Sequence, residues 1–116
     1  MYEILATVYG VKPSKDQIGK IRDHYDDWPS HLGESPYSGM GTDGEDNCVS
    51  NTEFIGVELN SIPTFEFYGT KVEDLGKGLT DEIKEKAKSA CKEIRLVVKG
   101  CEDFPEPYLF LNHYTS

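Results

Sequence analysis

Carboxylates are the residues of this chain with the clearest chemical potential. Between Asp23 and Thr70, here called the acidic segment, the sequence holds acidic side chains but no lysine or arginine. Such segregation predicts an anionic surface that attracts cationic partners and repels nucleic acid. The acidic residues are Asp23, Asp26, Asp27, Glu34, Asp43, Glu45, Asp46, Glu53, Glu58 and Glu66.

Two other kinds of chemistry find little support in the sequence. Asp43, Glu45, Asp46 and Asn47 offer clustered oxygen ligands for Ca²⁺ or Mg²⁺, but Cys48 stands where an EF-hand loop needs glycine. Zinc would require a tighter array than His24, His31 and Cys48 provide.

Catalysis is not favoured either. Cys48 with either histidine could form a nucleophile and base, but no local signature supports that pair, and no glycine-rich phosphate loop is present. We therefore expect a non-enzymatic protein without metal or cofactor.

Size and composition predict a single domain spanning residues 1–116. The net charge is −9, and aromatic residues make up 11% of the chain, which argues against global disorder. The three cysteines are odd in number and lack C-x-x-C spacing, which favours reduced thiols and a cytoplasmic setting. The start of the chain lacks a basic leader, and the apolar runs are too short to span a bilayer, so we expect no membrane partner.

Periodicity predicts four strands and two helices. Alternating apolar residues indicate strands at 2–9, 53–60, 64–68 and 108–114, with breaks at 10–13 and a turn at 61–63. Ser14 and Gln17 form a capping box that opens a helix over 15–28. Thr80 caps a second helix over 81–99, whose expected core stripe is Ile83, Ala87, Ala90, Cys91, Ile94, Val97 and Val98.

The order of these elements predicts an α+β fold of the ferredoxin-like βαββαβ type. Its four-stranded antiparallel sheet would carry both helices on one face. The other face would be acidic and aromatic, and residues 29–51 would form a long acidic loop rich in Gly, Ser, Pro and Asp. The expected open face carries Glu3, Leu5, Thr7, Tyr9, Glu58, Glu66 and Tyr68, with Tyr108, Phe110 and Tyr114 or the alternate residues of the last strand.

A hairpin register follows if the apolar residues of the two middle strands share a face. Val57 would then lie opposite Phe67, and Leu59 opposite Phe65. The same register places Glu58 across from Glu66, where like charges destabilise the pair by a few tenths to about 1 kcal/mol. Either solvent and a nearby lysine absorb this cost, or the pair awaits a cation.

Recognition of a basic protein surface remains the leading functional hypothesis. Nucleic acid itself is an improbable partner, because phosphates would meet the carboxylates and no RNA-binding motif of the RNP1 type is present. Same-face residues along a strand repeat at about 6.7 Å, twice the rise between phosphates of one DNA strand, so acidic strands can imitate a nucleic-acid backbone. Small acidic single-domain proteins of this type are typical of phage-encoded inhibitors of restriction or CRISPR nucleases.

The expected function is thus inhibition of a nucleic-acid-binding protein by occupation of its cationic site. Two alternatives stay open: a small divalent-metal-dependent enzyme or ligand sensor that uses the acidic loop, and an acidic subunit of a larger assembly. The sequence leaves the oligomeric state open. The predicted partner-binding residues are Asp23, Asp26, Asp27, Trp28, Glu34, Tyr37, Asp43, Glu45, Asp46, Glu58, Glu66 and Tyr68.

Overall fold

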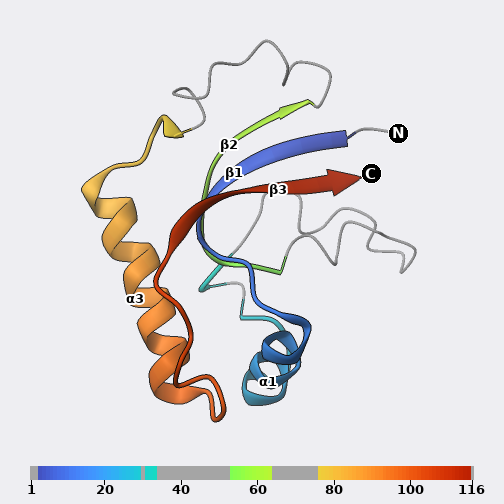
Figure 1. The fold of residues 1–116 in the computed structure, drawn as a ribbon, viewed down its shortest axis with the longest axis vertical. Coiled ribbons are helices and arrows are strands. Elements are labelled where there is room, and N and C mark those ends of the chain that lie inside the picture. The colour runs from blue at the N-terminus through green and yellow to red at the C-terminus, as the bar shows by residue number, and fades with distance from the viewer. Residues whose placement is uncertain (1–2, 30, 34–52, 64–75, 116) are drawn as a thin grey trace.

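A computed structural model describes residues 3–29, 31–33, 53–63 and 76–115 of the chain. The described residues form an α+β structure with a three-stranded antiparallel sheet and two helices (Figure 1). In chain order the elements are β1 (Glu3–Val11), α1 (Lys15–Tyr25), β2 (Ile55–Pro63), α3 (Asp81–Val97) and β3 (Tyr108–Thr115). No helix in these ranges is long and apolar enough to cross a bilayer.

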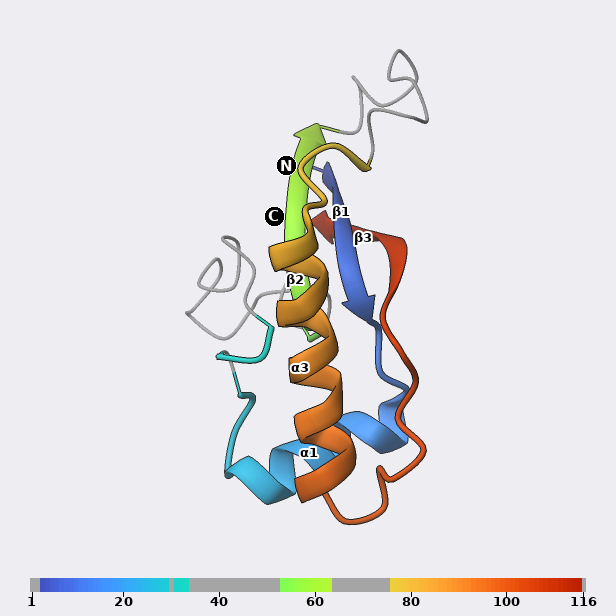
Figure 2. The same cartoon turned by 90° about the vertical axis from the view of Figure 1, so that its left-hand side faces the viewer.

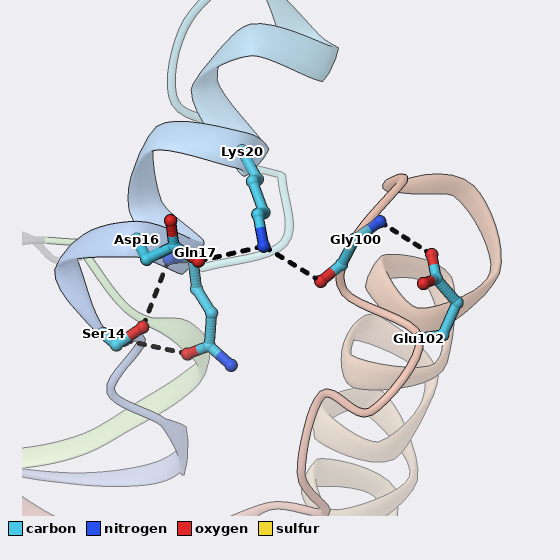
Figure 3. Close-up of polar contacts among 6 residues, drawn as sticks. All are labelled: Ser14, Asp16, Gln17, Lys20, Gly100 and Glu102. Atoms are coloured by element: carbon cyan, nitrogen blue, oxygen red, sulfur yellow. Dashed lines mark hydrogen bonds and ion pairs between the residues drawn. The ribbon is translucent and has the colours of Figure 1, made fainter.

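The first helix begins where the sequence predicts. The Gln17 backbone N–H donates to Ser14 Oγ at 3.2 Å, and the Ser14 N–H donates to Gln17 Oε1 at 2.8 Å, which completes the capping box (Figure 3). The helix ends at Tyr25, three residues before the predicted end, because Asp26 adopts the left-handed conformation with φ 67°. A residue in that conformation cannot continue a right-handed helix.

The second helix also begins at its predicted cap, where the Ile83 N–H donates to Thr80 Oγ1 at 3.2 Å. It ends at Val97 instead of residue 99. Ala87, Ala90, Cys91 and Ile94 form its buried stripe, as predicted. Val97 was wrongly assigned to that stripe and is 43% exposed, whereas Val98, the extended C-cap, is buried.

The strand order β2-β1-β3 gives the sheet a simpler pairing than predicted. β2 pairs directly and antiparallel with β1, whereas the split βαβ arrangement would place a strand between those that flank the first helix. The ferredoxin-like topology is therefore not confirmed, and the predicted strand at 64–68 lies outside the described residues. The predicted turn at 61–63 is wrong, because those residues continue β2, and β1 likewise runs through Gly10 to Val11.

A β-bulge changes the faces on which the strand residues lie. Thr7 pairs with Asn60 and Val8 with Glu58, so that Leu59 is the extra residue of β2. Because directly opposed residues share a face, Glu58 lies on the same face as Val8, not on the opposite face as predicted. The alternation of apolar residues in the sequence carries no mark of this inserted residue.

The central strand β1 is buried on both of its faces. Ala6 and Val8, on one face, are fully buried, and Thr7, on the other, is only 5% exposed. Val11 shares the face of Thr7 and packs in one cluster with Ile55 and the buried residues of α3. The predicted open, acidic and aromatic face therefore does not exist along this part of β1.

The two helices meet beyond the end of the sheet. Helix α3 lies along β1 and β2, while α1 lies below the strands beside the C-terminal end of α3 (Figures 1 and 2). Lys20 of α1 forms an ion pair with Asp16 at 2.9 Å and donates to the Gly100 carbonyl at 3.4 Å (Figure 3). Gly100 in turn donates its N–H to Glu102 Oε2 at 2.8 Å, so the turn after α3 is tied to α1.

A pair of glycines allows β1 and β2 to approach closely. Gly10 and Gly56 are register partners, and a Cβ on Gly10 would lie 1.9 Å from the Ile55 carbonyl oxygen. A Cβ on Gly56, where φ is 137°, would lie 2.3 Å from the Tyr9 carbonyl oxygen. Backbone atoms cannot give way as a flexible side chain can, so both positions require glycine.

Alanine at either of these glycines should lower the free energy of unfolding by about 1–3 kcal/mol through overpacking, with added backbone strain at position 56. Gly19→Ala is the matched control, because a Cβ there meets no atom within 4 Å and alanine favours helix over glycine. Urea unfolding of Gly10→Ala, Gly56→Ala and Gly19→Ala measures the effect. Equal stability of Gly10→Ala and Gly19→Ala would contradict the close approach.

The cysteines that the structure describes are free and buried. Cys91 and Cys101 both belong to the core cluster and form no disulfide, as predicted, while Cys48 lies outside the described residues. Burial raises the pKa of the Cys91 thiol to about 11, although Arg95 partly opposes the shift. Because the thiolate is the reactive form, the folded protein should protect this cysteine.

We expect three reactive thiols in the denatured chain and slow modification of Cys91 in the folded chain. The raised pKa lowers the thiolate population of Cys91 at pH 8 by roughly a hundredfold relative to an ordinary cysteine. Thiol titration with and without denaturant, followed by peptide mapping, measures both. A denatured count near one would reveal a disulfide and contradict the prediction of reduced thiols.

Candidate functional site

The structure describes five of the twelve predicted partner-binding residues: Asp23, Asp26, Asp27, Trp28 and Glu58. The first four lie together where α1 ends, and Glu58 lies on β2. The other predicted residues, which are Glu34, Tyr37, Asp43, Glu45, Asp46, Glu66 and Tyr68, lie outside the described residues. The C-terminal end of α1 is therefore the part of the predicted site whose contacts the structure describes.

Three exposed aspartates surround this helix end. Asp23 lies in the helix, Asp26 is its C-cap, and Asp27 follows. Within the described ranges, Asp23 and Asp26 have no ion pair or hydrogen bond through their carboxylates. The C-terminal end of a helix carries partial negative charge, so carboxylates there destabilise the helix. Their placement is one that folding alone does not favour.

Arg22, one residue before the acidic segment, neutralises two of its members. Its Nη2 lies 2.8 Å from Glu53 Oε2 and its Nε donates to the same oxygen at 2.9 Å. Its Nη1 lies 3.3 Å from Asp27 Oδ1. Glu53 is only 8% exposed, so its charge is compensated inside the protein and is not offered to a partner.

Trp28, which was predicted to anchor a partner, packs instead against the core of the protein. Its ring packs against the core cluster, and the Arg22 guanidinium carbon lies 6.0 Å from the ring centroid. The Trp28 backbone N–H donates to Asp27 Oδ1 at 2.7 Å. Its indole Nε1 is buried and has no hydrogen-bond partner in the described structure. Trp28 therefore joins the acidic helix end to the core.

Glu58 lies on a different element from the aspartates and is less exposed than they are. It is half-buried on β2, opposite Val8, and it interacts with other groups of the protein. The predicted face-to-face repulsion with Glu66 concerns a residue outside the described ranges. The structure thus does not bring Glu58 and the α1 aspartates into one patch.

A polar cluster that the sequence did not reveal lies between α1, α3 and residues 31–33. Tyr25 donates its hydroxyl hydrogen to Glu93 Oε2 at 2.7 Å, and His31 Nε2 lies 3.5 Å from the same oxygen. The rings of Tyr25 and His31 meet edge to face with centroids 5.8 Å apart. Burial, and then the contact with Glu93, raises the pKa of Tyr25.

This cluster borders an open cleft of about 340 Å³. Buried Leu32, Gly56 and Ala90 line its apolar part, and the polar lining consists of His31, Lys86, Ser89 and Glu93. The helical members follow i, i+3, i+4 and i+7 spacing, which places them on one face of α3. That spacing can be read from the sequence, but the position of His31 beside this face of α3 depends on tertiary structure. Among the described residues, no three potential metal ligands converge.

The folded protein favours the protonated Tyr25 phenol and should therefore lose stability at alkaline pH. Because its folded pKa is raised, its contribution is complete below the pKa of an unfolded tyrosine, near 10, and is lost as pH rises further. Above about pH 10, wild-type stability should fall more steeply than that of Tyr25→Phe, by at most about 1.4 kcal/mol per pH unit. Urea unfolding between pH 9 and 11.5 measures this, with Tyr108→Phe as the control. Parallel curves for wild type and Tyr25→Phe would rule out the coupling.

Comparison of the chain with protein-family models, with curated proteins and with solved structures found no match. Function must therefore be argued from the charges and contacts of this chain.

Proposed function

We propose that this chain is a non-enzymatic, cytoplasmic binding protein that inhibits a nucleic-acid-binding partner by occupying its cationic site. Its mode of action would be that of phage-encoded inhibitors of restriction or CRISPR nucleases. The observation that carries the proposal is the set of exposed aspartates at the negative end of α1, where two carboxylates have no partner among the described residues. These aspartates are the first acidic residues of the acidic segment, which contains no lysine or arginine.

Carboxylates at a helix C-terminus are unfavourable for the folded state, and local rules are most often broken where a protein uses the residues for function. Asp26 also holds the left-handed conformation, which asparagine or glycine adopts more readily. A protein that needed only solubility could carry its acids at the N-terminal end of a helix, where they stabilise it. Asp81 and Glu82 in the first turn of α3 have that favourable placement.

Exposed carboxylates without internal partners can take over the role of nucleic-acid phosphates towards lysine and arginine side chains. Asp27 and Glu53 are less suited, because Arg22 holds both. The proposed contact therefore uses Asp23 and Asp26 together with the acids of residues 34–52. A further strand over 64–68 also stays a proposal.

Replacing Asp23 and Asp26 with asparagine should weaken partner binding while stabilising the free protein. We expect the free energy of unfolding to rise by about 0.5–1 kcal/mol, because negative charge leaves the helix C-terminus. Partner affinity should fall about three- to tenfold, and Asp43→Asn/Glu45→Gln/Asp46→Asn should have the same or a larger effect. Glu82→Gln/Glu85→Gln is the charge-matched control for the first variant, since it also removes two carboxylates but from α3.

The partner is first captured from a bacterial lysate on the immobilised full chain, identified by mass spectrometry and purified. Calorimetry then measures affinity at low and high salt for each variant, with duplex DNA and single-stranded RNA as competitors. Affinity should fall with rising salt, and a nucleic acid should displace the chain. Salt-independent binding to a protein that nucleic acid does not displace would overturn the proposal.

A further inference from the structure

Strand β3 forms an edge of the sheet built by the described residues. Its one described neighbour is β1, and the order β2-β1-β3 leaves its other side without a described partner strand. An edge strand presents backbone N–H and C=O groups that can pair with another strand. Proteins usually protect such edges with charged residues, proline or a bulge. β3, Tyr108–Thr115, contains no Asp, Glu, Lys, Arg or Pro, and its pairing with β1 shows no bulge.

The side chains of β3 add an apolar surface to this backbone edge. Leu109 and Leu111 are 47% and 44% exposed, and their register partners Tyr9 and Thr7 place both on one face of the sheet. Tyr108, at the start of the strand, is also exposed. Neighbouring exposed leucines on an unprotected edge are a feature that a monomeric protein ordinarily avoids.

The distribution of charge along the chain indicates which kind of molecule can cover this edge. At a net charge of −9, two copies of the chain repel each other wherever their carboxylates meet. The eight residues of β3 include no Asp, Glu, Lys or Arg, so this edge is a place where two copies can approach without that cost. A basic partner, by contrast, would find no carboxylate on this strand.

We propose that β3 pairs antiparallel with β3 of a second copy of this chain. Antiparallel pairing makes an edge complementary to itself, so a two-fold axis satisfies both copies with the same contacts. The two three-stranded sheets would join into one continuous sheet. In a register that places Leu109 opposite Leu111 of the second copy, all four leucines share a face and shield one another from water.

This dimer is independent of the proposed inhibitory function, because it uses no residue of the acidic segment. Helix α1, with its exposed aspartates, lies below the strands, whereas β3 ends at the upper right, away from α1 (Figure 1). Dimerisation would therefore leave the α1 aspartates accessible. It would display them twice, which suits a partner that is itself a dimer.

Sedimentation equilibrium of the full chain tests the proposal over a range of micromolar to millimolar concentrations. We expect a monomer–dimer equilibrium, and Leu111→Lys or Leu109→Lys should weaken it at least tenfold by placing a charge on the edge. Leu96→Lys is the matched control, because Leu96 is 73% exposed but lies on α3, and it should leave the equilibrium unchanged. Circular dichroism verifies that each variant is folded.

Hydrogen exchange provides a second measurement that needs no variant. Amides of residues 108–115 should gain protection as the wild-type concentration rises, while those of α3 should not. A chain that stays monomeric at 1 mM would overturn the proposal. A dimer whose affinity is unchanged by Leu109→Lys and Leu111→Lys would also overturn it, as would open-ended assembly in place of a closed dimer.

Discussion

The contact on which the rest of the structure depends is the close approach of two backbones at Gly10 and Gly56. No side chain separates the strands there, so β1 and β2 stay paired up to the match of Val11 with Ile55. Those last two residues are the part of the sheet that enters the core cluster beneath α3. A second close approach, in which a Cβ on Gly33 would lie 2.0 Å from the Phe54 carbonyl oxygen, places residues 31–33 against the start of β2.

The Arg22–Glu53 ion pair couples this packing to the distribution of charge. Glu53 directly precedes the buried Phe54 and Ile55, and its carboxylate is buried with them. Removal of Arg22 would leave a buried charge without its partner, which is strongly destabilising. The same guanidinium also holds Asp27 and lies near the ring of Trp28. One basic residue thus connects the core, the tryptophan and the acidic helix end.

The structure separates carboxylates that maintain the fold from carboxylates that are free to act. Glu53, Asp27 and Glu93 each have an internal partner: Arg22 for the first two, and Tyr25 with His31 for the third. Asp23 and Asp26 belong to the second group within the described residues, and they occupy positions that a helix disfavours. Net charge alone does not make this distinction. Carboxylates of the second group are therefore the stronger candidates for a functional role.

The sequence alone determined the local features of this protein. The capping box of Ser14, the Thr80 cap and the buried stripe of α3 all follow from interactions within a few residues, and periodicity reveals them. The α+β class and the free state of Cys91 and Cys101 were also predicted correctly. At the site, the sequence correctly indicated that the acidic residues at the end of α1 are exposed.

Only the tertiary structure decided the contacts between distant residues. The bulge at Leu59 moved Glu58 to the face of Val8, since the choice of face depends on which residues of β1 it pairs with. The pairing of Glu53 with Arg22, and of Glu93 with Tyr25 and His31, joins elements whose spacing in the chain carries no periodic signal. Residues within one helix or strand are related by its fixed geometry, whereas residues of different elements are related only by how those elements pack.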